Sequence, residues 1–369
     1  MERALSLAEK GVGLASPNPA IGCVLVKNNV VVGEGFHIYD NKDHAEIVAL
    51  KQAGEQARGA TVYITMEPCS HHGRTGPCAD ALIEAGVSRV VAAVRDPNPK
   101  VSGRGLDRLQ AAGISLTIGV KEAAARRINE AFAKFIRTRR PFVTMKAGLT
   151  LDGRIAPPRS KNHVPSGSTH WITGDRSREM VQQLRHGADA IMTGIGTILN
   201  DDPMLTDRSG RPRRRPFLRV VLDSSLKLSL DSQLVRTASQ DVLVFHTAAA
   251  RERANELKER GVMVERLAPD PVSGKVSMRA AMERLAEMEM ISVILEGGSQ
   301  INASALGAQI VDKMFLFYAP VIYGDAASPV VRSLEANTYF TTRLGSYRLY
   351  ELGEDFGVEG YIHNPWEAA

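Results

Sequence analysis

Three short stretches decide how the first half of this 369-residue chain folds, namely His44-Ala45-Glu46, Pro68-Cys69 and Pro77-Cys78. One histidine and two cysteines can supply three ligands to a zinc ion, and a glutamate two residues after the histidine remains available to move protons. Zinc with three protein ligands keeps one position open, and water bound there loses a proton near neutral pH. The pattern predicts a hydrolytic zinc site with His44, Cys69 and Cys78 as metal ligands and Glu46 as the proton-transferring residue.

The order of these residues is similar to the signature of zinc nucleobase deaminases, in which a histidine and a glutamate precede a proline and two closely spaced cysteines. This chain differs in one respect, because the eight residues 70–77 separate Cys69 from Cys78. An alternative interpretation is a pair of buried structural thiols beside an unrelated histidine. The glutamate and the two prolines favour the zinc site.

The composition indicates which kind of ligand the protein binds and in which cellular compartment it acts. The chain has a formal net charge of +5 and a pI near 9.1, but acidic residues are interspersed with the basic ones. This favours phosphorylated small molecules over nucleic acid as ligands. We expect no membrane segment and no secretory signal, because no apolar run is long enough and the first residues lack the basic-then-apolar order. Three cysteines in so long a chain indicate a reducing compartment, so we expect a cytoplasmic protein.

The spacing of apolar residues predicts an alternating α/β pattern in the first half. We expect helices at residues 1–14, 44–53, 79–85 and 105–112, a hairpin of strands at 21–26 and 30–32, and strands at 61–65, 89–94 and 114–118. One long charged helix at 122–138 follows, and Pro141 stops it. We place the domain boundary there, with domains at 1–144 and 145–369.

A second α/β pattern fills the rest of the chain. We expect strands at 142–147, 190–193, 218–222, 242–245 and 292–295, helices at 175–186, 251–260 and 278–288, and β-rich segments at 314–322 and 338–342. The basic run RPRRRP at 211–216 is interpreted as a solvated surface loop.

Two glycine-containing turns follow predicted strands. The sequence ILEGGS at 294–299 runs from a buried strand into a helix, where free N–H groups could bind a phosphate, although such glycines often only turn the chain. The sequence GIGTIL at 194–199 lacks the third glycine of a dinucleotide fingerprint, and we expect no helix directly after it, so no Rossmann domain is predicted.

In these and further motifs the chain closely resembles the RibD family of bifunctional riboflavin-biosynthesis proteins, and the resemblance covers nearly its whole length. In the first half the resemblance rests on PNPAIG at 17–22, HAE at 44–46, TMEPCSHHGRTGPC at 65–78 and DPNP at 96–99. In the second half it rests on KAG at 146–148, LDGR at 151–154, WIT at 171–173, Thr197, DDP at 201–203 and EGG at 296–298. The long loop between the cysteines is this family's own version of the motif.

The resemblance implies an α/β protein with two domains. The N-terminal domain would be cytidine-deaminase-like, with three α/β/α layers, and would hydrolyse the amine of 2,5-diamino-6-(5-phosphoribosylamino)pyrimidin-4(3H)-one. The C-terminal domain would resemble dihydrofolate reductase and would use NADPH to reduce the ribosyl side chain, giving 5-amino-6-(5-phosphoribitylamino)uracil. It also implies one Zn2+ per deaminase domain and homo-oligomers formed through the reductase domain.

The resemblance also assigns residues. Substrate-binding positions are Asn18, Arg74, Thr169, Arg185, Leu205, Arg208 and Glu296. NADPH-binding positions are Gly148, Trp171, Thr197, Asp201, Ser224, Gly298, Ser299 and Gln300. Three of these residues also have a simpler structural interpretation. Arg74 could be a solvent-facing charge in a loop, and Arg185 could pair with Glu179 or face solvent. Trp171 could be an aromatic residue of the core.

The sequence departs from the family in three places, one of which is Gly76, where the family usually has proline. Ser168-Thr169 stands before the tryptophan where the family has Glu-Ser, and the loop at 155–170 is longer than expected. Three alternative functions are a deaminase with a degenerate reductase, an RNA-editing deaminase and a structural zinc module. The retained reductase motifs argue against the first, the lack of aromatics among the basic runs against the second, and the free glutamate against the third.

Overall fold

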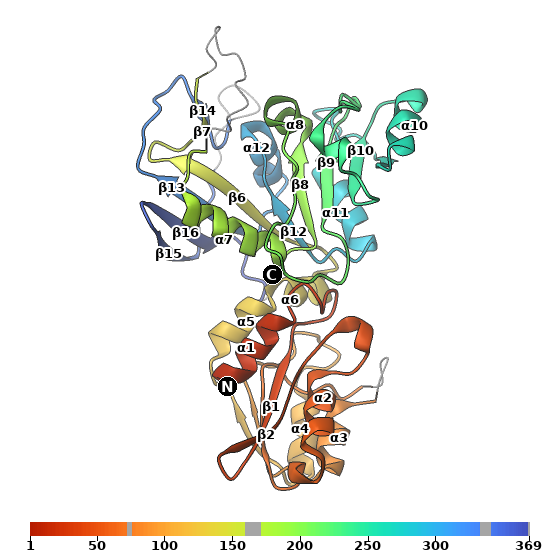
Figure 1. Ribbon diagram of the computed structural model, residues 1–369, viewed down its shortest axis with the longest axis vertical. Coiled ribbons are helices and arrows are strands. Elements are labelled where there is room, and N and C mark those ends of the chain that lie inside the picture. The colour runs from red at the N-terminus through yellow and green to blue at the C-terminus, as the bar shows by residue number, and fades with distance from the viewer. Residues whose placement is uncertain (72–75, 159–170, 333–340, 368–369) are drawn as a thin grey trace. The chain divides into compact units, whose positions relative to one another are not determined.

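Figure 1 shows the computed structural model of the chain, which describes residues 1–71, 76–158, 171–332 and 341–367. It contains two compact units. Unit 1 comprises Met1–Arg139, Pro212–Arg215 and Pro365–Ala369, and unit 2 comprises Arg140–Arg211 and Pro216–Asn364. Across the described ranges, no helix is both long and apolar enough to cross a membrane.

Unit 1 is built on a five-stranded sheet with the order β2-β1-β3-β4-β5. The strands are β1 (Gly22–Lys27), β2 (Val30–Phe36), β3 (Thr61–Ile64), β4 (Arg89–Ala92) and β5 (Ser115–Ile118). The hairpin β1–β2 is antiparallel as predicted, and β3, β4 and β5 run parallel. Carboxyl ends of these parallel strands therefore share one edge of the sheet, where binding sites of such folds form.

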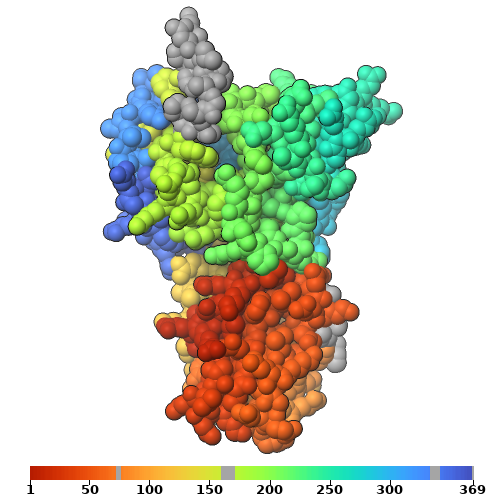
Figure 2. Space-filling view, viewed as in Figure 1, coloured from red at the N-terminus to blue at the C-terminus, as the bar shows by residue number. Residues whose placement is uncertain are grey.

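Helices cover both faces of this sheet. They are α1 (Glu2–Lys10), α2 (Ala45–Ala53), α3 (Cys78–Glu84), α4 (Arg104–Ala111), α5 (Glu122–Ile128) and α6 (Glu130–Thr138), with short 3-10 turns η1 (Tyr39–Asn41) and η2 (Gly54–Ala57). Apolar residues of α2, α3 and α4 pack with Cys23 and Leu25 of β1, whereas α1 packs on the other side with Val24. The expected three-layer α/β/α arrangement is confirmed. The N-terminal segment, red in Figure 2, forms part of the surface of unit 1.

Two glycines of β2 let α2 lie directly on the strand. A Cβ atom on Gly33 would stand 2.2 Å from the carbonyl oxygen of Ala49, and one on Gly35 would stand 2.6 Å from the Cβ of Val48. Larger residues would push the helix away from the sheet. This close packing fixes the first turn of α2, and with it His44 at the N-cap and Glu46.

The prediction of a single long helix at 122–138 is wrong. Asn129 interrupts it with non-helical torsion angles and separates α5 from α6. The reason is a buried contact, since the Asn129 side chain accepts a hydrogen bond from Ala20 N at 2.8 Å and donates one to Ala20 O at 3.0 Å. Asparagine competes well with helical hydrogen bonding through such contacts.

Unit 2 contains a nine-stranded sheet with the order β11-β10-β9-β8-β12-β6-β13-β16-β15. Its strands are β6 (Phe142–Thr150), β8 (Ala190–Gly194), β9 (Leu218–Leu222), β10 (Val242–His246), β11 (Met263–Arg266), β12 (Ser292–Leu295), β13 (Lys313–Ala319), β15 (Ser346–Leu352) and β16 (Asp355–Tyr361). The strands β7 (Arg154–Ala156) and β14 (Ser328–Pro329) form a separate pair. All neighbours from β11 to β13 are parallel, and β16 and β15 add antiparallel strands.

Helices also pack on both faces of this second sheet. They are α7 (Asp175–His186), α8 (Ile195–Asp201), α9 (Gln233–Arg236), α10 (Arg251–Glu259), α11 (Met278–Glu287) and α12 (Ser299–Gly307). One apolar core joins α11 and α12 to the strands, and another joins α8, α9 and α10 to the opposite face. Figure 1 shows α7 beside β13 and β16, where Val181 packs against Phe315 and Phe317.

Several expectations for unit 2 need correction. A helix, α8, does follow Gly194 directly, and the strands β11, β15 and β16 were not predicted. Of the β-rich segment expected at 338–342, residues 338–340 lie outside the described ranges, and residues 341 and 342 are not in a strand. The helix expected after the glycine turn at 294–299 is α12, with Gly298 at its N-cap and Ser299 as its first residue.

Candidate functional site

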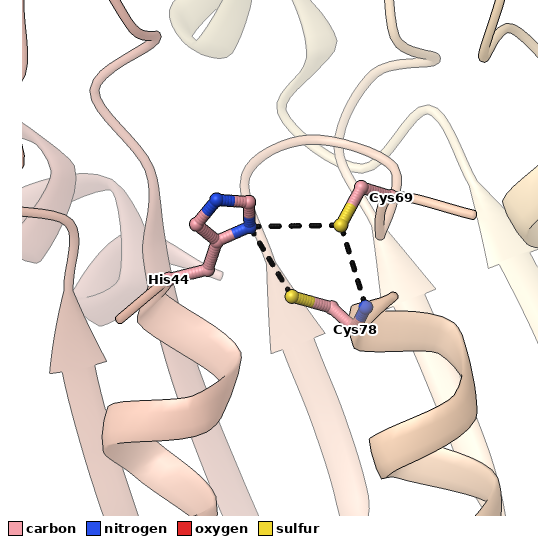
Figure 3. A group of neighbouring side chains, drawn as sticks. All are labelled: His44, Cys69 and Cys78. Atoms are coloured by element: carbon pink, nitrogen blue, oxygen red, sulfur yellow. Dashed lines mark hydrogen bonds between the residues drawn. The ribbon is translucent and has the colours of Figure 1, made fainter. Parts of the chain in front are cut away.

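The three predicted metal ligands come together at the carboxyl-end edge of the unit 1 sheet (Figure 3). The sulfur atoms of Cys69 and Cys78 lie 3.6 Å and 3.3 Å from Nδ1 of His44, and one ligand atom from each residue falls within 4.8 Å of the others. His44 caps α2 and Cys78 begins α3, so two helix starts and the loop after β3 supply the donors. This set matches the thiolate and imidazole ligands that zinc prefers.

The loop that carries Cys69 is held by hydrogen bonds. The Cys69 sulfur accepts a hydrogen bond from Cys78 N at 3.3 Å, and Ala79 N donates to Cys69 O at 3.1 Å. Hydrogen bonds from the Cys78 side chain and from His44 lower the pKa of the Cys69 thiol. The thiolate is the form of cysteine that binds a metal, so a thiol that ionises readily is suited to this role.

Glu46 lies in the first turn of α2, beside the three ligands. Its side chain is only 1% exposed, and its Oε2 atom has no hydrogen-bond partner among the described residues. Burial, together with the charge on Cys69, raises the pKa of the Glu46 carboxyl to about 7. A carboxyl group that titrates near neutrality can both accept and donate a proton.

Asn18 is oriented by a histidine that the sequence analysis did not single out. Asn18 Nδ2 lies 3.1 Å from His37 Nε2, and Nδ1 of the same ring lies 2.9 Å from Asp43 O. The His37 ring also meets the His44 ring edge to face, with centroids 5.2 Å apart. Asn18 therefore belongs to the same neighbourhood as the metal ligands.

Glu67 anchors the chain just before Cys69. Its carboxylate is 2% exposed and accepts four backbone hydrogen bonds, from Asp96 at 3.2 Å, Gly103 at 3.0 Å, Gly105 at 3.0 Å and Leu106 at 3.3 Å. At Gly105 the backbones approach so closely that a Cβ atom would stand 1.9 Å from Pro68 O. These contacts fix Pro68 and Cys69 against the start of α4.

In unit 2, Glu296 is the centre of a charged cluster. Arg185 on α7 donates to both of its carboxylate oxygens, at 2.9 Å and 3.0 Å, and Lys146 on β6 donates at 3.3 Å. Burial alone would disfavour the carboxylate, but the charges of Lys146 and Arg185 outweigh it and lower the pKa of Glu296 to about 2. Arg185 thus donates hydrogen bonds to Glu296 and to the Thr206 carbonyl. The simpler interpretation, in which it pairs with Glu179 or faces solvent, is wrong.

The glycine turn after β12 leaves space at the start of α12. A Cβ atom on Gly298 would meet no atom of the described residues within 4 Å, and the same holds for Gly196 at the start of α8. The Ser299 hydroxyl donates to the Pro329 carbonyl, and Gln300 is exposed. Both helices begin beside each other, because β8 and β12 are neighbouring parallel strands.

The other predicted reductase positions vary in their surroundings. Gly148 lies on β6 near the Thr173 side chain, and Thr197 and Asp201 lie on α8. Trp171 is 57% exposed, with the Arg178 guanidinium 5.4 Å from its ring centroid, so it is not a core aromatic. Ser224 follows β9, and its hydroxyl accepts a hydrogen bond from Val276 N at 3.0 Å.

Two predicted substrate positions in unit 2 differ in exposure. Leu205 has a positive φ of 55° and is only 4% exposed, with its side chain in an apolar core, so it offers little surface to a ligand. Arg208 has an exposed side chain, and its backbone N–H donates to Gln182. Arg74 and Thr169 lie outside the described residues.

Lys146, His37 and Glu67 are the residues near these sites that the sequence analysis did not assign. Lys146 and Glu67 stand inside motifs that it quoted, next to residues that were assigned. His37 lies alone in the sequence, and no local spacing marks it. Only the fold brings it to Asn18.

Comparison with known proteins agrees with this geometry. Residues 1–94 match the family model of the cytidine and deoxycytidylate deaminase zinc-binding region, and residues 141–357 match that of the RibD C-terminal domain. The riboflavin biosynthesis protein RibD of Aquifex aeolicus is 39% identical over 361 residues, covering 97% of this chain and 96% of that protein. RibD of Escherichia coli K12 is 40% identical over 338 residues, covering 89% and 88%.

Solved structures give the same result. Acinetobacter baumannii RibD is similar with a TM-score of 0.80 and 34% identity, covering 98% of this chain and 97% of that one. The diaminohydroxyphosphoribosylaminopyrimidine deaminase/5-amino-6-(5-phosphoribosylamino)uracil reductase of Thermotoga maritima is similar with a TM-score of 0.78 and 33% identity over the same shares.

Fold and site together define a two-domain enzyme in which a deaminase is joined to a reductase. The chain belongs to the RibD family of riboflavin biosynthesis proteins. Its hydrolase and oxidoreductase halves are the cytidine-deaminase-like unit and the RibD C-terminal unit, as the sequence predicted.

Proposed function

We propose that this enzyme hydrolyses the amine of 2,5-diamino-6-(5-phosphoribosylamino)pyrimidin-4(3H)-one in unit 1. In unit 2 it would then reduce the ribosyl side chain with NADPH, giving 5-amino-6-(5-phosphoribitylamino)uracil. One observation carries the first step, namely three metal-binding side chains within 4.8 Å beside the buried, unpartnered Oε2 of Glu46. Family membership supports the choice of substrate and the order of the two steps.

The donor set fits one zinc ion. His44, Cys69 and Cys78 supply one imidazole nitrogen and two sulfurs, which leaves one position of a tetrahedral site open. When bound, zinc acts as a Lewis acid that makes water nucleophilic at neutral pH. A cation there would also lower the pKa of Glu46 from about 7 by favouring the carboxylate.

Glu46 would move the protons of the hydrolysis. As a carboxylate it takes a proton from the attacking water, and it returns a proton to the amine, which leaves as ammonia. Its burial in the first turn of α2 keeps bulk water from competing for these protons. Asn18, held by His37, would orient the pyrimidine, and Arg74 would meet the phosphate as a basic residue of the cysteine loop.

Unit 2 has features that fit a nicotinamide dinucleotide. The open space at Gly298 and Gly196 lies at two adjacent helix starts, where backbone N–H groups favour phosphate. Gly148, Trp171, Thr197, Asp201, Ser224, Ser299 and Gln300 complete the proposed NADPH site. The cofactor, when bound, supplies a hydride, and the protein supplies its orientation and a proton.

The cluster around Glu296 fits the reducing step. Lys146 is the more exposed of the two cationic donors to Glu296, with a side chain that is 18% exposed against 10% for Arg185, so a ligand can reach it. We infer that Lys146 gives a proton to the ribosyl oxygen as the side chain is opened, while Glu296 and Arg185 fix its position. Leu205, Arg208 and Thr169 are the further positions proposed to bind the substrate.

An apolar sheet face in unit 2 supports a homo-oligomer. Tyr347 and Leu349 of β15 and Phe356 of β16 are exposed, and strand register places them on the same face as Leu316 and Tyr318 of β13. The opposite face of these strands packs against α7. Contiguous exposed apolar residues are typical of protein interfaces, and a second copy of this face would cover them.

Three free thiols support a reducing compartment, and we propose that the protein acts in the cytoplasm. The interspersed acidic and basic residues support small-molecule substrates over nucleic acid.

A product assay on the purified full chain tests the proposal. With zinc, NADPH and the diaminopyrimidine ribotide, ammonia released and NADPH oxidised should be equal in amount. Mass spectrometry should find the ribityl uracil as the product. Ammonia without NADPH oxidation would contradict the reductase half, and NADPH oxidation only with the pre-deaminated uracil would contradict the deaminase half.

A further inference from the structure

The basic run at 211–216 is not used by either proposed reaction. Its composition predicts a solvated loop, but only part of the run fits that description. Pro212–Arg215 belong to unit 1, although the residues on either side belong to unit 2. Four residues from the second half of the chain therefore complete the unit that holds the metal ligands.

Arg214 makes most of the contacts of this segment. Its side chain is 21% exposed. Nη1 donates to the Ser16 carbonyl at 2.9 Å, Nε donates to Asp40 Oδ1 at 3.1 Å, and the guanidinium lies 3.8 Å from the centroid of the Tyr39 ring. Its backbone N–H donates to Gly13 O at 2.9 Å. A planar guanidinium can make these directed hydrogen bonds and stack on an aromatic ring at the same time.

These contacts hold the loop that ends at Asn18. Gly13 and Ser16 are bound directly, and Asn18 N donates to Ala15 O at 2.9 Å. Arg215 adds a hydrogen bond from Nη2 to Ser16 Oγ at 3.2 Å. Tyr39 N donates to Leu14 O at 3.2 Å, so Arg214 spans two segments that already touch each other.

We propose that Arg214 is a positioning residue of the deaminase, which fixes the loop at 13–18 so that Asn18 faces the substrate. The inference rests on the proposed role of Asn18 in binding the pyrimidine ribotide. Arg214 does not touch the reacting atoms. It acts through Ser16, Tyr39 and Asp40, and it makes the deaminase site depend on a segment from the second half of the chain.

Steady-state kinetics on the full chain test this. Arg214→Ala should raise KM for the diaminopyrimidine ribotide by about tenfold, because a loop that is no longer fixed must be ordered at each binding event. The rate of reduction of the pre-deaminated uracil and the zinc content should stay at wild-type values, which also shows that the variant is folded. Arg211→Ala, an exposed arginine of the same run, should leave both reactions unchanged.

Two further variants separate positioning from charge. Arg214→Lys keeps the positive charge but loses the planar fork, so its KM should stay closer to that of Arg214→Ala than to wild type. In an Asn18→Ala background, Arg214→Ala should add little to the increase in KM, because both act through the same side chain. Purely additive effects would show that Arg214 acts independently of Asn18 and would overturn the inference.

The remaining outcomes distinguish the inference from the proposed function. A wild-type KM in Arg214→Ala, with Asn18→Ala impaired, overturns the inference alone. Equal losses of deamination and reduction in Arg214→Ala also overturn it, because they indicate general unfolding. A wild-type enzyme that releases no ammonia from this substrate overturns the proposed function itself, and the inference with it.

Discussion

Arg185 and Glu296 form a paired, two-point contact, with Nε and Nη2 of the arginine at 2.9 Å and 3.0 Å from the two carboxylate oxygens. Arg185 is 9% exposed, and its third nitrogen donates to the Thr206 carbonyl. Such a pair fixes both side chains with little freedom left. It ties α7 to the end of β12, whereas Lys146, with a side chain that is 18% exposed, is the more accessible cation of the cluster.

The first prediction concerns the stability of unit 2 and its dependence on pH. The pKa of Glu296 is lowered from 4.5 to about 2, so the carboxylate stabilises the folded state above pH 4.5, and this contribution is lost as the pH falls towards 2. Glu296→Gln should therefore reduce the free energy of unfolding by up to about 3 kcal/mol at neutral pH. The difference from wild type should shrink below pH 4.5.

Hydrogen exchange of peptides from β6 and β12, measured in urea, reports this change for unit 2 alone. Exchange in β1 and β3 of unit 1 serves as the internal control. A pH-independent difference between the two proteins would mean that the charge on Glu296 does not stabilise the fold.

A second prediction assigns Lys146 to reduction. Lys146→Met should lower the rate of NADPH oxidation with the pre-deaminated uracil by about a hundredfold or more, because the proton donor is lost. Ammonia release should not change. The matched control is Lys313→Met, since Lys313 also pairs with a carboxylate, Glu359, at 3.0 Å, but is buried in the sheet. Lys313→Met should lower thermal stability but leave the rate of NADPH oxidation per folded molecule near the wild-type value. A wild-type rate of NADPH oxidation in Lys146→Met would rule out the assignment.

A third prediction concerns Glu67. In Glu67→Gln an amide NH2 replaces one of the two oxygens that accept backbone N–H groups, so two buried N–H donors lose their acceptor. We expect zinc affinity to fall by about tenfold or more, because supporting contacts of this kind typically contribute that much to metal binding. Competition with a chromogenic chelator measures it.

Asp189→Asn provides the control for Glu67→Gln. Asp189 is likewise a buried carboxylate that accepts backbone hydrogen bonds, from Ile291 at 2.9 Å and Ser292 at 3.1 Å, but it lies in unit 2. The Asp189→Asn variant should destabilise unit 2 without changing the affinity for zinc. Equal zinc affinity in wild type and Glu67→Gln would contradict the anchoring role.

A fourth prediction concerns the break between α5 and α6. Asn129→Ala removes both hydrogen bonds to Ala20 and should reduce the free energy of unfolding of unit 1 by about 1–3 kcal/mol. Because Ala20 follows Pro19 and Asn18, hydrogen exchange should rise first in β1 and in the loop before it. Unchanged protection there would show that Asn129 only ends a helix.

Local patterns predicted most of the fold for clear physical reasons. Short apolar runs such as those at 218–222 and 292–295 coincide with β9 and β12, because buried parallel strands carry few polar residues. The edge strand β15 was missed because its exposed residues show no alternation with a buried face. The break at Asn129 was missed because its cause is a contact with Ala20, more than a hundred residues away in the chain.

The metal site was predictable for a different reason. The residue types and the local pairings of histidine with glutamate and of proline with cysteine carry the chemistry, and the fold brings His44, Cys69 and Cys78 together. The predicted hairpin of β1 and β2 accounts for the contact of Asn18 with His37, whereas the contact of Arg185 with Glu296 depends on strand order, which no local pattern reveals. The substrate and cofactor positions in unit 2 remain predictions for the same reason.

The measurement that tests the central claim most directly is ammonia release by Glu46→Gln beside the wild type, with zinc content determined on the same samples. We predict that the variant binds as much zinc as wild type, releases no measurable ammonia from the diaminopyrimidine ribotide, and still reduces the pre-deaminated uracil at the wild-type rate. Ammonia release at the wild-type rate by zinc-loaded Glu46→Gln would contradict the account, because the buried carboxyl would then have no part in moving the protons of the deamination.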